Sequence, residues 1–207
     1  MKKLYWIAGA MICILPLVNQ PGEAAENQAF AKEKAALLGD GMHMGERVGS
    51  TAWIKQGDSK AEEKKFELAA AAYTKALEID KSDSDTYFKR GEMYLALQQY
   101  DLAQADYSEA INLKTGNLAA YFKRSVAWYY LHDYQRSIDD TEVVIQLQAK
   151  HGGAYLIKAV CQQKLGKDDL AIETYQAMLK NVPASQKEAI KVAKKMLQQL
   201  GAGANVK

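Results

Sequence analysis

The feature that most constrains this chain is a sequence repeat with a period of 34 residues. The sequence Tyr-Phe-Lys-Arg stands at 87–90 and returns at 121–124, and Tyr100 returns as Tyr134. A fixed period of this length indicates a repeat array, in which one small unit of secondary structure recurs along the chain. We therefore expect a fold in which each unit packs mainly against its neighbours in sequence.

The repeat frame extends in both directions without an insertion and gives four repeats, 50–83, 84–117, 118–151 and 152–185. The copies agree in residue type at shared places, which is a stronger signal than one short motif. These places are the fourth (Trp53, Tyr87, Tyr121, Tyr155), the eighth (Gly57, Gly91, Ser125, Ala159), the twentieth (Ala69, Ala103, Ser137, Ala171), the twenty-fourth (Tyr73, Tyr107, Thr141, Tyr175) and the twenty-seventh (Ala76, Ala110, Val144, Met178).

Apolar residues within each repeat recur at helical spacing in two separate stretches. In the second repeat, one stretch contains Tyr87, Tyr94 and Leu97, and the other contains Tyr107 and Ile111. Such spacing places the side chains on one face of a helix. Each repeat is therefore predicted to be two helices, with small residues that let neighbouring helices approach closely. One such pair cannot bury its own apolar face, so the pairs must stack.

This pattern resembles the tetratricopeptide repeat family, and the resemblance covers residues 50–185. Gly166 at an inner turn and Pro183 at a repeat end add to it, whereas residues 60–65 depart from the family's usual inner turn. The resemblance implies an all-α fold, an α-α superhelix (solenoid) of four helix-turn-helix repeats whose first helices line a concave face. It also implies a binding module for a peptide or a partner protein.

The predicted concave face holds two rows of side chains. Lys55, Lys89 and Lys123 form a lysine ladder, and Phe88 and Phe122 belong to an apolar stripe beside it. A groove of this kind suits a peptide with apolar anchors and some acidic residues. The alternative is a solvated face whose lysine stems cover the aromatic rings. The predicted partner-binding residues are Lys55, Phe88, Lys89, Glu92, Phe122, Lys123, Val126, Tyr129, Tyr130 and Leu156.

Some members of the family grip the C-terminal carboxylate of a peptide with a set of lysine, asparagine and arginine side chains. The predicted lining supplies lysines but no asparagine, because Asn112, Asn117 and Asn181 fall on second helices or at turns. A receptor for chaperone tails is therefore not predicted.

Two arginines occupy a place that is apolar in many repeats of this family. Arg90 and Arg124 each have an aspartate sixteen residues later, Asp106 and Asp140, on the facing helix. The repeats that lack the arginine also lack the aspartate, with Gln56 and Ala72 in one and Lys158 and Thr174 in the other. We therefore predict two structural ion pairs, Arg90 with Asp106 and Arg124 with Asp140.

The N-terminus begins with Lys2 and Lys3, followed by an uncharged apolar run over residues 4–18. A run of fifteen residues is short for a membrane span, which needs about 20. It fits the apolar core of a signal peptide over residues 1–24, with cleavage after Ala24 or, alternatively, after Ala25. We expect an exported protein of bacterial type, periplasmic or secreted. The alternative is an uncleaved membrane anchor with the repeats outside the cytoplasm.

Residues 25–49 are predicted to be a short helix followed by a Gly/Met-rich linker. Met42-His43-Met44 carries ligand types that suit copper(I), but the sequence supplies no second cluster. We therefore predict a plain loop, with no metal and no cofactor.

The C-terminal residues 186–200 show apolar residues at helical spacing with lysines opposite. They are predicted to form a helix that caps the last repeat, because repeat stacks need polar ends. The alternative is a basic amphipathic helix that binds a membrane surface. Residues 201–207 are predicted to be a flexible tail.

Composition and motifs exclude several function classes. The net charge of +2 offers no basic face for nucleic acid. Cys161 is predicted to be a small buried residue, and it would be the only cysteine after cleavage. No catalytic motif accompanies His132 or His151, which fall at turns. The leading hypothesis is an exported, non-enzymatic adaptor, and the alternative is a membrane-anchored assembly subunit of an envelope or secretion complex.

Overall fold

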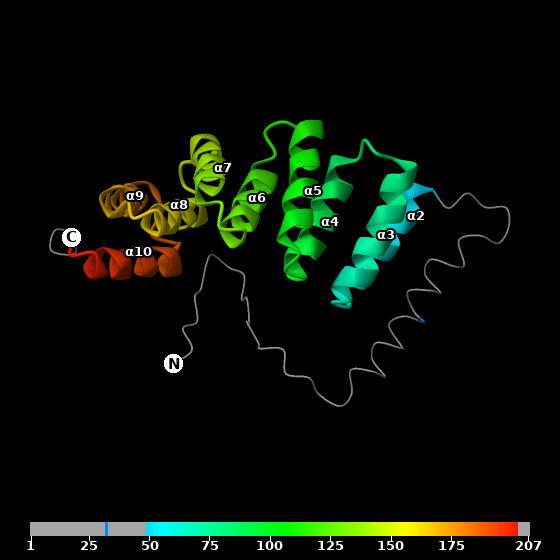
Figure 1. Cartoon of the computed structure of the whole chain (residues 1–207), viewed down its shortest axis with the longest axis horizontal. Helices are drawn as coiled ribbons and strands as arrows, with labels where there is room; N and C mark the ends of the chain where they lie inside the picture. Colours follow the sequence, from blue (N-terminus) through cyan, green and yellow to red (C-terminus); the bar gives the residue numbers. More distant parts are fainter. Residues whose placement is uncertain (1–31, 33–48, 203–207) are drawn as a thin grey trace, which may run out of the picture. The chain divides into compact units, whose positions relative to one another are not determined.

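The computed structural model describes Lys32 and residues 49–202. Residues 49–202 form nine helices and contain no strand, so the predicted all-α fold class is confirmed (Figure 1). The predicted signal peptide, the Met42-His43-Met44 triplet and residues 203–207 lie outside the described residues. The helices are α2 (Ser50–Glu62), α3 (Phe66–Ile79), α4 (Ser84–Ala96), α5 (Tyr100–Leu113), α6 (Leu118–Tyr130), α7 (Tyr134–Leu147), α8 (Gly152–Lys164), α9 (Asp168–Asn181) and α10 (Lys187–Gln199).

The period seen in the sequence is also the period of the helices. The first helices of the repeats begin at residues 50, 84, 118 and 152, and the second helices at 66, 100, 134 and 168. Each start therefore lies 34 residues after the previous one of its kind, and each helix falls inside its predicted repeat. The helices therefore recur with the same 34-residue period as the residues.

The helices fall into two compact units. The first contains α2, α3 and α4 and ends at Gln99, and the second contains α5 to α10 and begins at Tyr100. Consecutive helices pack on one another within each unit, and in the second unit α8 also contacts α6 and α10. The core of the second unit gathers around the last repeat and α10. Its buried residues are Tyr155, Leu156, Ala159, Ala171, Tyr175, Met178, Val182, Ala193 and Leu197.

Small residues allow the helices of a repeat to approach closely, as the sequence predicts. A Cβ atom at Gly57 would lie only 2.5 Å from a ring atom of Tyr73, which is buried on α3. The third repeat has Ser125 and Thr141 at the corresponding places, and both are fully buried. Their hydroxyl groups donate hydrogen bonds to backbone carbonyls of their own helices. Glycine therefore faces a large ring in the first repeat, whereas two medium-sized polar side chains take these places in the third.

The inner turns of the four repeats share a left-handed residue at the fifteenth place. Lys64, Gln98, His132 and Gly166 have φ angles of 59°, 59°, 63° and 71°. This conformation costs a residue with a side chain more than it costs glycine. Only the fourth repeat has glycine at this place. The other three repeats adopt the same left-handed turn with a residue that carries a side chain.

The C-terminal helix continues the repeat frame. Ala193 lies 34 residues after Ala159, and both are fully buried small residues. Helix α10 begins at Lys187, one residue after the start that the period gives, and its lysines are exposed. Ala202 also packs against the core, and its N–H donates to the Leu197 carbonyl at 2.9 Å. The packed chain thus runs two residues into the predicted tail.

Among the described helices, none is both long enough and apolar enough to span a membrane.

Candidate functional site

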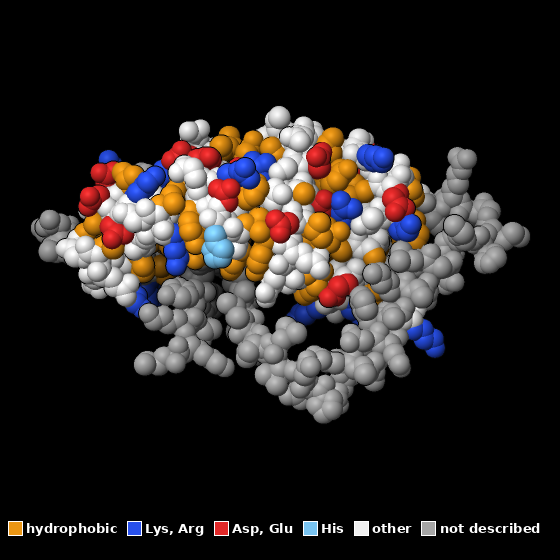
Figure 2. Space-filling model, viewed as in Figure 1, with side chains coloured by type: hydrophobic (Ala, Val, Ile, Leu, Met, Phe, Trp, Pro, Cys, Tyr) orange, Lys and Arg blue, Asp and Glu red, His pale blue; other side chains and the backbone are white. Residues whose placement is uncertain are grey.

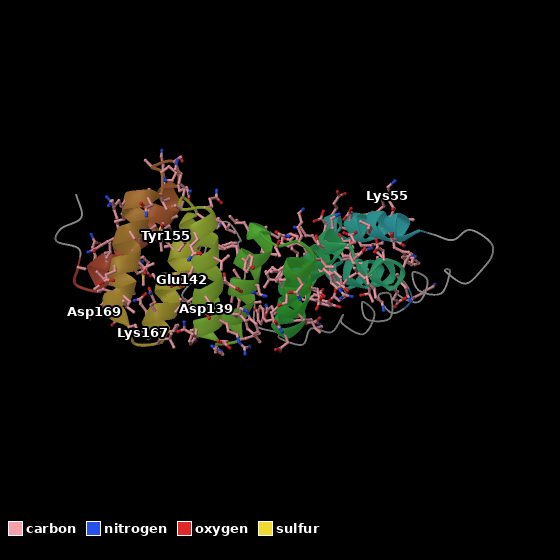
Figure 3. All side chains as sticks on the ribbon, turned by 90° about the horizontal axis from the view of Figure 1, so that it is seen from above. Lys55, Asp139, Glu142, Tyr155, Lys167 and Asp169 are labelled. Carbon is pink, nitrogen blue, oxygen red and sulfur yellow. The ribbon has the colours of Figure 1, made fainter. Side chains whose placement is uncertain are left out.

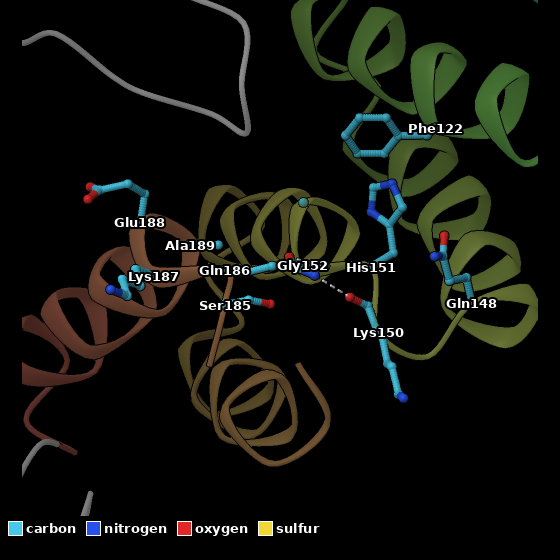
Figure 4. Close-up of a pocket in the computed structure, with 11 residues that line it drawn as sticks. Phe122, Gln148, Lys150, His151, Gly152, Ser185, Gln186, Lys187, Glu188 and Ala189 are labelled. Carbon is cyan, nitrogen blue, oxygen red and sulfur yellow. Dashed lines mark hydrogen bonds between the residues drawn. The ribbon is translucent and has the colours of Figure 1, made fainter. Parts of the chain in front are cut away.

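The second unit contains a cavity of about 680 Å³ beside Phe122, which we call the Phe122 cavity. Phe122 on α6 and His151 before α8 stand on one side, and the start of α10 stands on the other (Figure 4). The full lining is Phe122, Gln148, Lys150, His151, Gly152, Gly153, Ser185, Gln186, Lys187, Glu188 and Ala189. The cavity thus joins an aromatic wall to groups that donate and accept hydrogen bonds.

The aromatic wall is held from two sides. The rings of Phe122 and His151 lie 4.5 Å apart between centroids, at an interplanar angle of 51°. Phe122 also packs against a buried cluster that contains Ile138, Ile157 and Cys161. These contacts fix the ring, because a packed side chain has few rotamers open to it.

Gln186 ties the start of α10 to the turn before α8. Its Oε1 accepts a hydrogen bond from the Gly152 N–H at 3.3 Å, and its Nε2 donates to the Lys150 carbonyl at 2.8 Å (Figure 4). A Cβ atom at Gly152 would lie 2.5 Å from Gln186 Oε1, so the glycine leaves room for the amide. The opposite side of the cavity is therefore positioned by two hydrogen bonds from one side chain.

His151 caps the N-terminus of α8. Its Nδ1 accepts a hydrogen bond from the Ala154 N–H at 3.1 Å. Burial lowers the pKa of His151, and a backbone hydrogen bond offsets part of this effect. The ring therefore favours its neutral form, which is the form that can accept from a backbone N–H.

The predicted lysine ladder is partly used within the protein. In the first unit, Lys89 donates to both carboxylate oxygens of Asp58, at 2.8 and 2.9 Å. Tyr73 also donates to Asp58, at 2.7 Å. Burial raises the pKa of Asp58, but the hydrogen bonds from Lys89 and Tyr73 outweigh it and leave the pKa below its usual value. Lys89 is therefore a structural cation that joins α4 to α2, which the sequence analysis missed.

Other predicted groove residues also lie among neighbours. Phe88 and Glu92 are half-buried on α4, and Lys123 is half-buried on α6. Each of these three makes further interactions within the protein. Lys55 is exposed on α2 (Figure 3). Of these four predicted groove residues, one is therefore exposed to solvent and three interact with other parts of the protein.

The aromatic residues of α6 form a row that extends beyond the predicted stripe. Tyr130 stacks on Tyr100 with centroids 4.6 Å apart, and Tyr129 meets Tyr130 edge-on at 5.4 Å. Tyr129 and Val126 also pack against the cluster around Ile157. None of these residues lines the Phe122 cavity, so their contacts stabilise the packing of α6 outside the cavity.

Leu156 does not lie on an open groove, which corrects the prediction. It is only 3% exposed and belongs to the core of the second unit. Helix α10 packs against that same core, so the last repeat is covered where a further repeat would otherwise begin.

One predicted ion-pair position holds a two-point contact between α6 and α7. Arg124 donates from Nε and Nη2 to the two carboxylate oxygens of Asp140, at 2.8 and 2.7 Å, and from Nη1 to Ser108 at 2.9 Å. In the first unit, Arg90 donates to Thr74 at 3.0 Å. Arg90 and Asp106 belong to different units, and their pairing stays a prediction.

The remaining chemistry of the described residues offers few reactive groups. Cys161 is fully buried, as predicted, and burial raises the pKa of its thiol to about 11. The described part of the chain contains no cluster of three or more His, Cys, Asp or Glu side chains suited to a metal ion. In Figure 2, acidic and basic side chains are interspersed on the visible face.

Comparison with known families identifies the repeats. Family models described as "Tetratricopeptide repeat" match residues 50–83, 72–105 and 154–185. The chain carries tetratricopeptide repeats. The predicted resemblance is therefore confirmed, and the tetratricopeptide fold supports a protein–protein interaction module. No curated protein matches the sequence at a significant level.

Solved tetratricopeptide repeat structures share the fold at low sequence identity. The MamA protein is 23% identical, with 74% of this chain and 84% of that chain covered and a TM-score of 0.67. The first TPR of Spaghetti (RPAP3), bound to the HSP90 peptide SRMEEVD, is 22% identical, with 61% and 99% covered and a TM-score of 0.55. The Arabidopsis OM64 TPR domain is 21% identical, with 55% and 94% covered and a TM-score of 0.53. These likenesses show the fold alone.

Proposed function

We propose that this chain is an exported, non-enzymatic interaction module that binds a peptide segment of a partner protein in the Phe122 cavity. The observation that carries the proposal is the combination of a fixed aromatic wall with hydrogen-bonding groups around one cavity. An apolar side chain of the peptide would pack against Phe122. Its backbone would hydrogen-bond to the amides of Gln148 and Gln186, which is how grooves combine affinity with orientation.

The peptide-bound RPAP3 structure supports a peptide as the kind of ligand, because it shows a repeat of this fold holding one. Its peptide is not carried over to this chain. Asn117 serves as the N-cap of α6 here, and Asn181 donates to the Tyr155 hydroxyl. Neither asparagine lines the Phe122 cavity, so the lining offers no lysine–asparagine set for a terminal carboxylate.

A peptide selected on the chain should lose affinity when Phe122 is truncated. We would select from a random peptide library displayed on phage and measure the affinity of a synthetic winner by fluorescence anisotropy. We expect Phe122→Ala to weaken binding at least tenfold, about 1.4 kcal/mol, because a buried aromatic anchor carries much of such an interface. Circular dichroism checks that the variant is folded.

The matched control for this measurement is Leu170→Ala. Leu170 is 44% exposed on α9 and does not line the cavity, so its truncation should leave the affinity unchanged. Equal affinity of Phe122→Ala and the parent chain would move the binding site off the cavity.

The N-terminus distinguishes the adaptor from the membrane-anchored assembly subunit. The basic start and the apolar run over residues 4–18 support export in both cases. We expect N-terminal sequencing of the protein recovered from its native cell to begin at Ala25, in a fraction free of membrane. An intact N-terminus in the membrane fraction would favour the anchored subunit.

A further inference from the structure

The first helices of the repeats use different residues as N-caps. The side chain of Asp83 accepts from the N–H groups of Asp85 and Thr86 before α4, and Asn117 accepts from Ala120 before α6. The corresponding residue before α8 is His151. Among these three caps, only the imidazole of histidine ordinarily changes charge between pH 5 and 8.

The cap hydrogen bond fixes the proton on the ring of His151. A backbone N–H can only donate, so the Nδ1 atom that accepts from Ala154 must be unprotonated. The neutral ring therefore carries its hydrogen on Nε2. Protonation would convert Nδ1 into a donor and leave the Ala154 N–H with the backbone carbonyl of His151, at 3.1 Å, as its one remaining acceptor. It would also place a positive charge at the positive end of α8.

The same residue belongs to the wall of the Phe122 cavity. Its ring contacts Phe122, and the residues on either side of it, Lys150 and Gly152, hold Gln186 at the start of α10. A rearrangement of His151 would therefore disturb Phe122 on one side of the cavity and, through the adjacent residues 150 and 152, Gln186 on the other side.

The surroundings of His151 do not favour its charged form. Lys150 lies beside it in the turn, and the start of α10 brings Lys187 and Glu188 to the same cavity. Phe122 from α6 and the two glycines of α8 carry no charge. Burial lowers the pKa of the ring in the folded protein. As the pH falls, the unfolded chain takes up the proton first, so this contribution to stability is complete above about pH 6.5 and declines below it.

We propose that His151 is a pH gate on the Phe122 cavity: its protonation uncaps α8, releases the wall formed with Phe122 and empties the cavity of ligand. At neutral pH the neutral ring keeps the cap, the wall and the start of α10 in register. The release of a peptide rests on the proposed function, whereas the uncapping of α8 does not.

The uncapping is tested on the full chain without any ligand. Amide hydrogen exchange of Ala154, corrected for its intrinsic pH dependence, should lose about fivefold protection between pH 7.5 and pH 5, as expected for the loss of one N-cap. The NMR shifts of the His151 ring should titrate with the same midpoint. His151→Asn should keep its protection at both pH values, because asparagine accepts from the same N–H and does not titrate.

His132→Asn serves as the control, because it removes a histidine from another turn and keeps His151. It should lose protection at Ala154 as the parent chain does. Unchanged protection in the parent, or an equal loss in His151→Asn, overturns the gate. A midpoint for Ala154 that departs from that of the His151 ring overturns it too.

A second arm uses the phage-selected peptide and measures its affinity at both pH values. We expect binding to weaken at least fivefold at pH 5 in the parent chain and to hold in His151→Asn. Equal weakening in both chains overturns the gating of the ligand. If no peptide is selected, the proposed function fails, and the Ala154 measurement still decides whether His151 controls α8.

Discussion

Arg124→Met is expected to lower the free energy of unfolding by about 3–5 kcal/mol, the cost of leaving a buried charge without its partner. The side chain of Asp140 is only 7% exposed, and both of its carboxylate oxygens accept from Arg124. Methionine fills a similar volume but donates no hydrogen bond. Urea denaturation followed by circular dichroism measures the loss.

The double variant Arg124→Met, Asp140→Leu should lose less than the single variant. It removes both charges, so no unpaired carboxylate stays buried between α6 and α7. Lys158→Met is the matched control, because Lys158 pairs with Glu142, whose side chain is 47% exposed. An exposed pair of this kind contributes about 1 kcal/mol or less. Equal losses in the single and double variants would contradict the proposed role of the pair.

The fold follows from the sequence because its repeat period fixes the packing several times over. The twentieth place holds a small, fully buried residue in every repeat, namely Ala69, Ala103, Ser137 and Ala171. A pattern that recurs in successive copies predicts the fold class, and the helices recur with the same period. The ion pair of Arg124 could be predicted for the same reason, because the repeats that lack the arginine also lack the aspartate.

The binding site was less predictable, because a periodic frame treats all repeats as equivalent. Leu156 shares its place with Phe122 in the frame, yet α10 packs against the core that buries it. Lys89 is engaged by Asp58, which lies 31 residues earlier and is easily missed by a search within one repeat. Pairing the ninth place of one repeat with the sixth place of the next would have suggested it.

The cavity itself depends on residues outside the repeating helices. His151 and Gln186 lie in the turns before α8 and α10. The predicted lining was drawn from the first helices alone, so it included neither residue. The signal was present in the N-cap series, where histidine replaces the aspartate and asparagine of earlier repeats. Such a change carries meaning only after the structure shows that the turn lines a cavity.

Gly57→Ala is expected to lower the free energy of unfolding by about 1–2 kcal/mol, although alanine is the better helix former. The new Cβ atom would lie 2.5, 2.7 and 2.9 Å from three ring atoms of Tyr73. That ring cannot move aside freely, because it is 2% exposed and its hydroxyl donates to Asp58 at 2.7 Å. Overpacking therefore outweighs the gain of about 1 kcal/mol in helix propensity.

The contact with Tyr73, rather than alanine itself, should cause this loss. In Gly49→Ala the new Cβ atom meets nothing within 4 Å, so any loss reports the weaker N-cap of α2 and not a steric contact. Tyr73→Thr removes the ring, so adding Gly57→Ala to Tyr73→Thr should cost less than adding Gly57→Ala to the parent chain. Urea midpoints of the four variants decide the matter. A Gly57→Ala midpoint at or above that of the parent chain would show that α2 and α3 can separate at no cost, which a close-packed repeat does not allow.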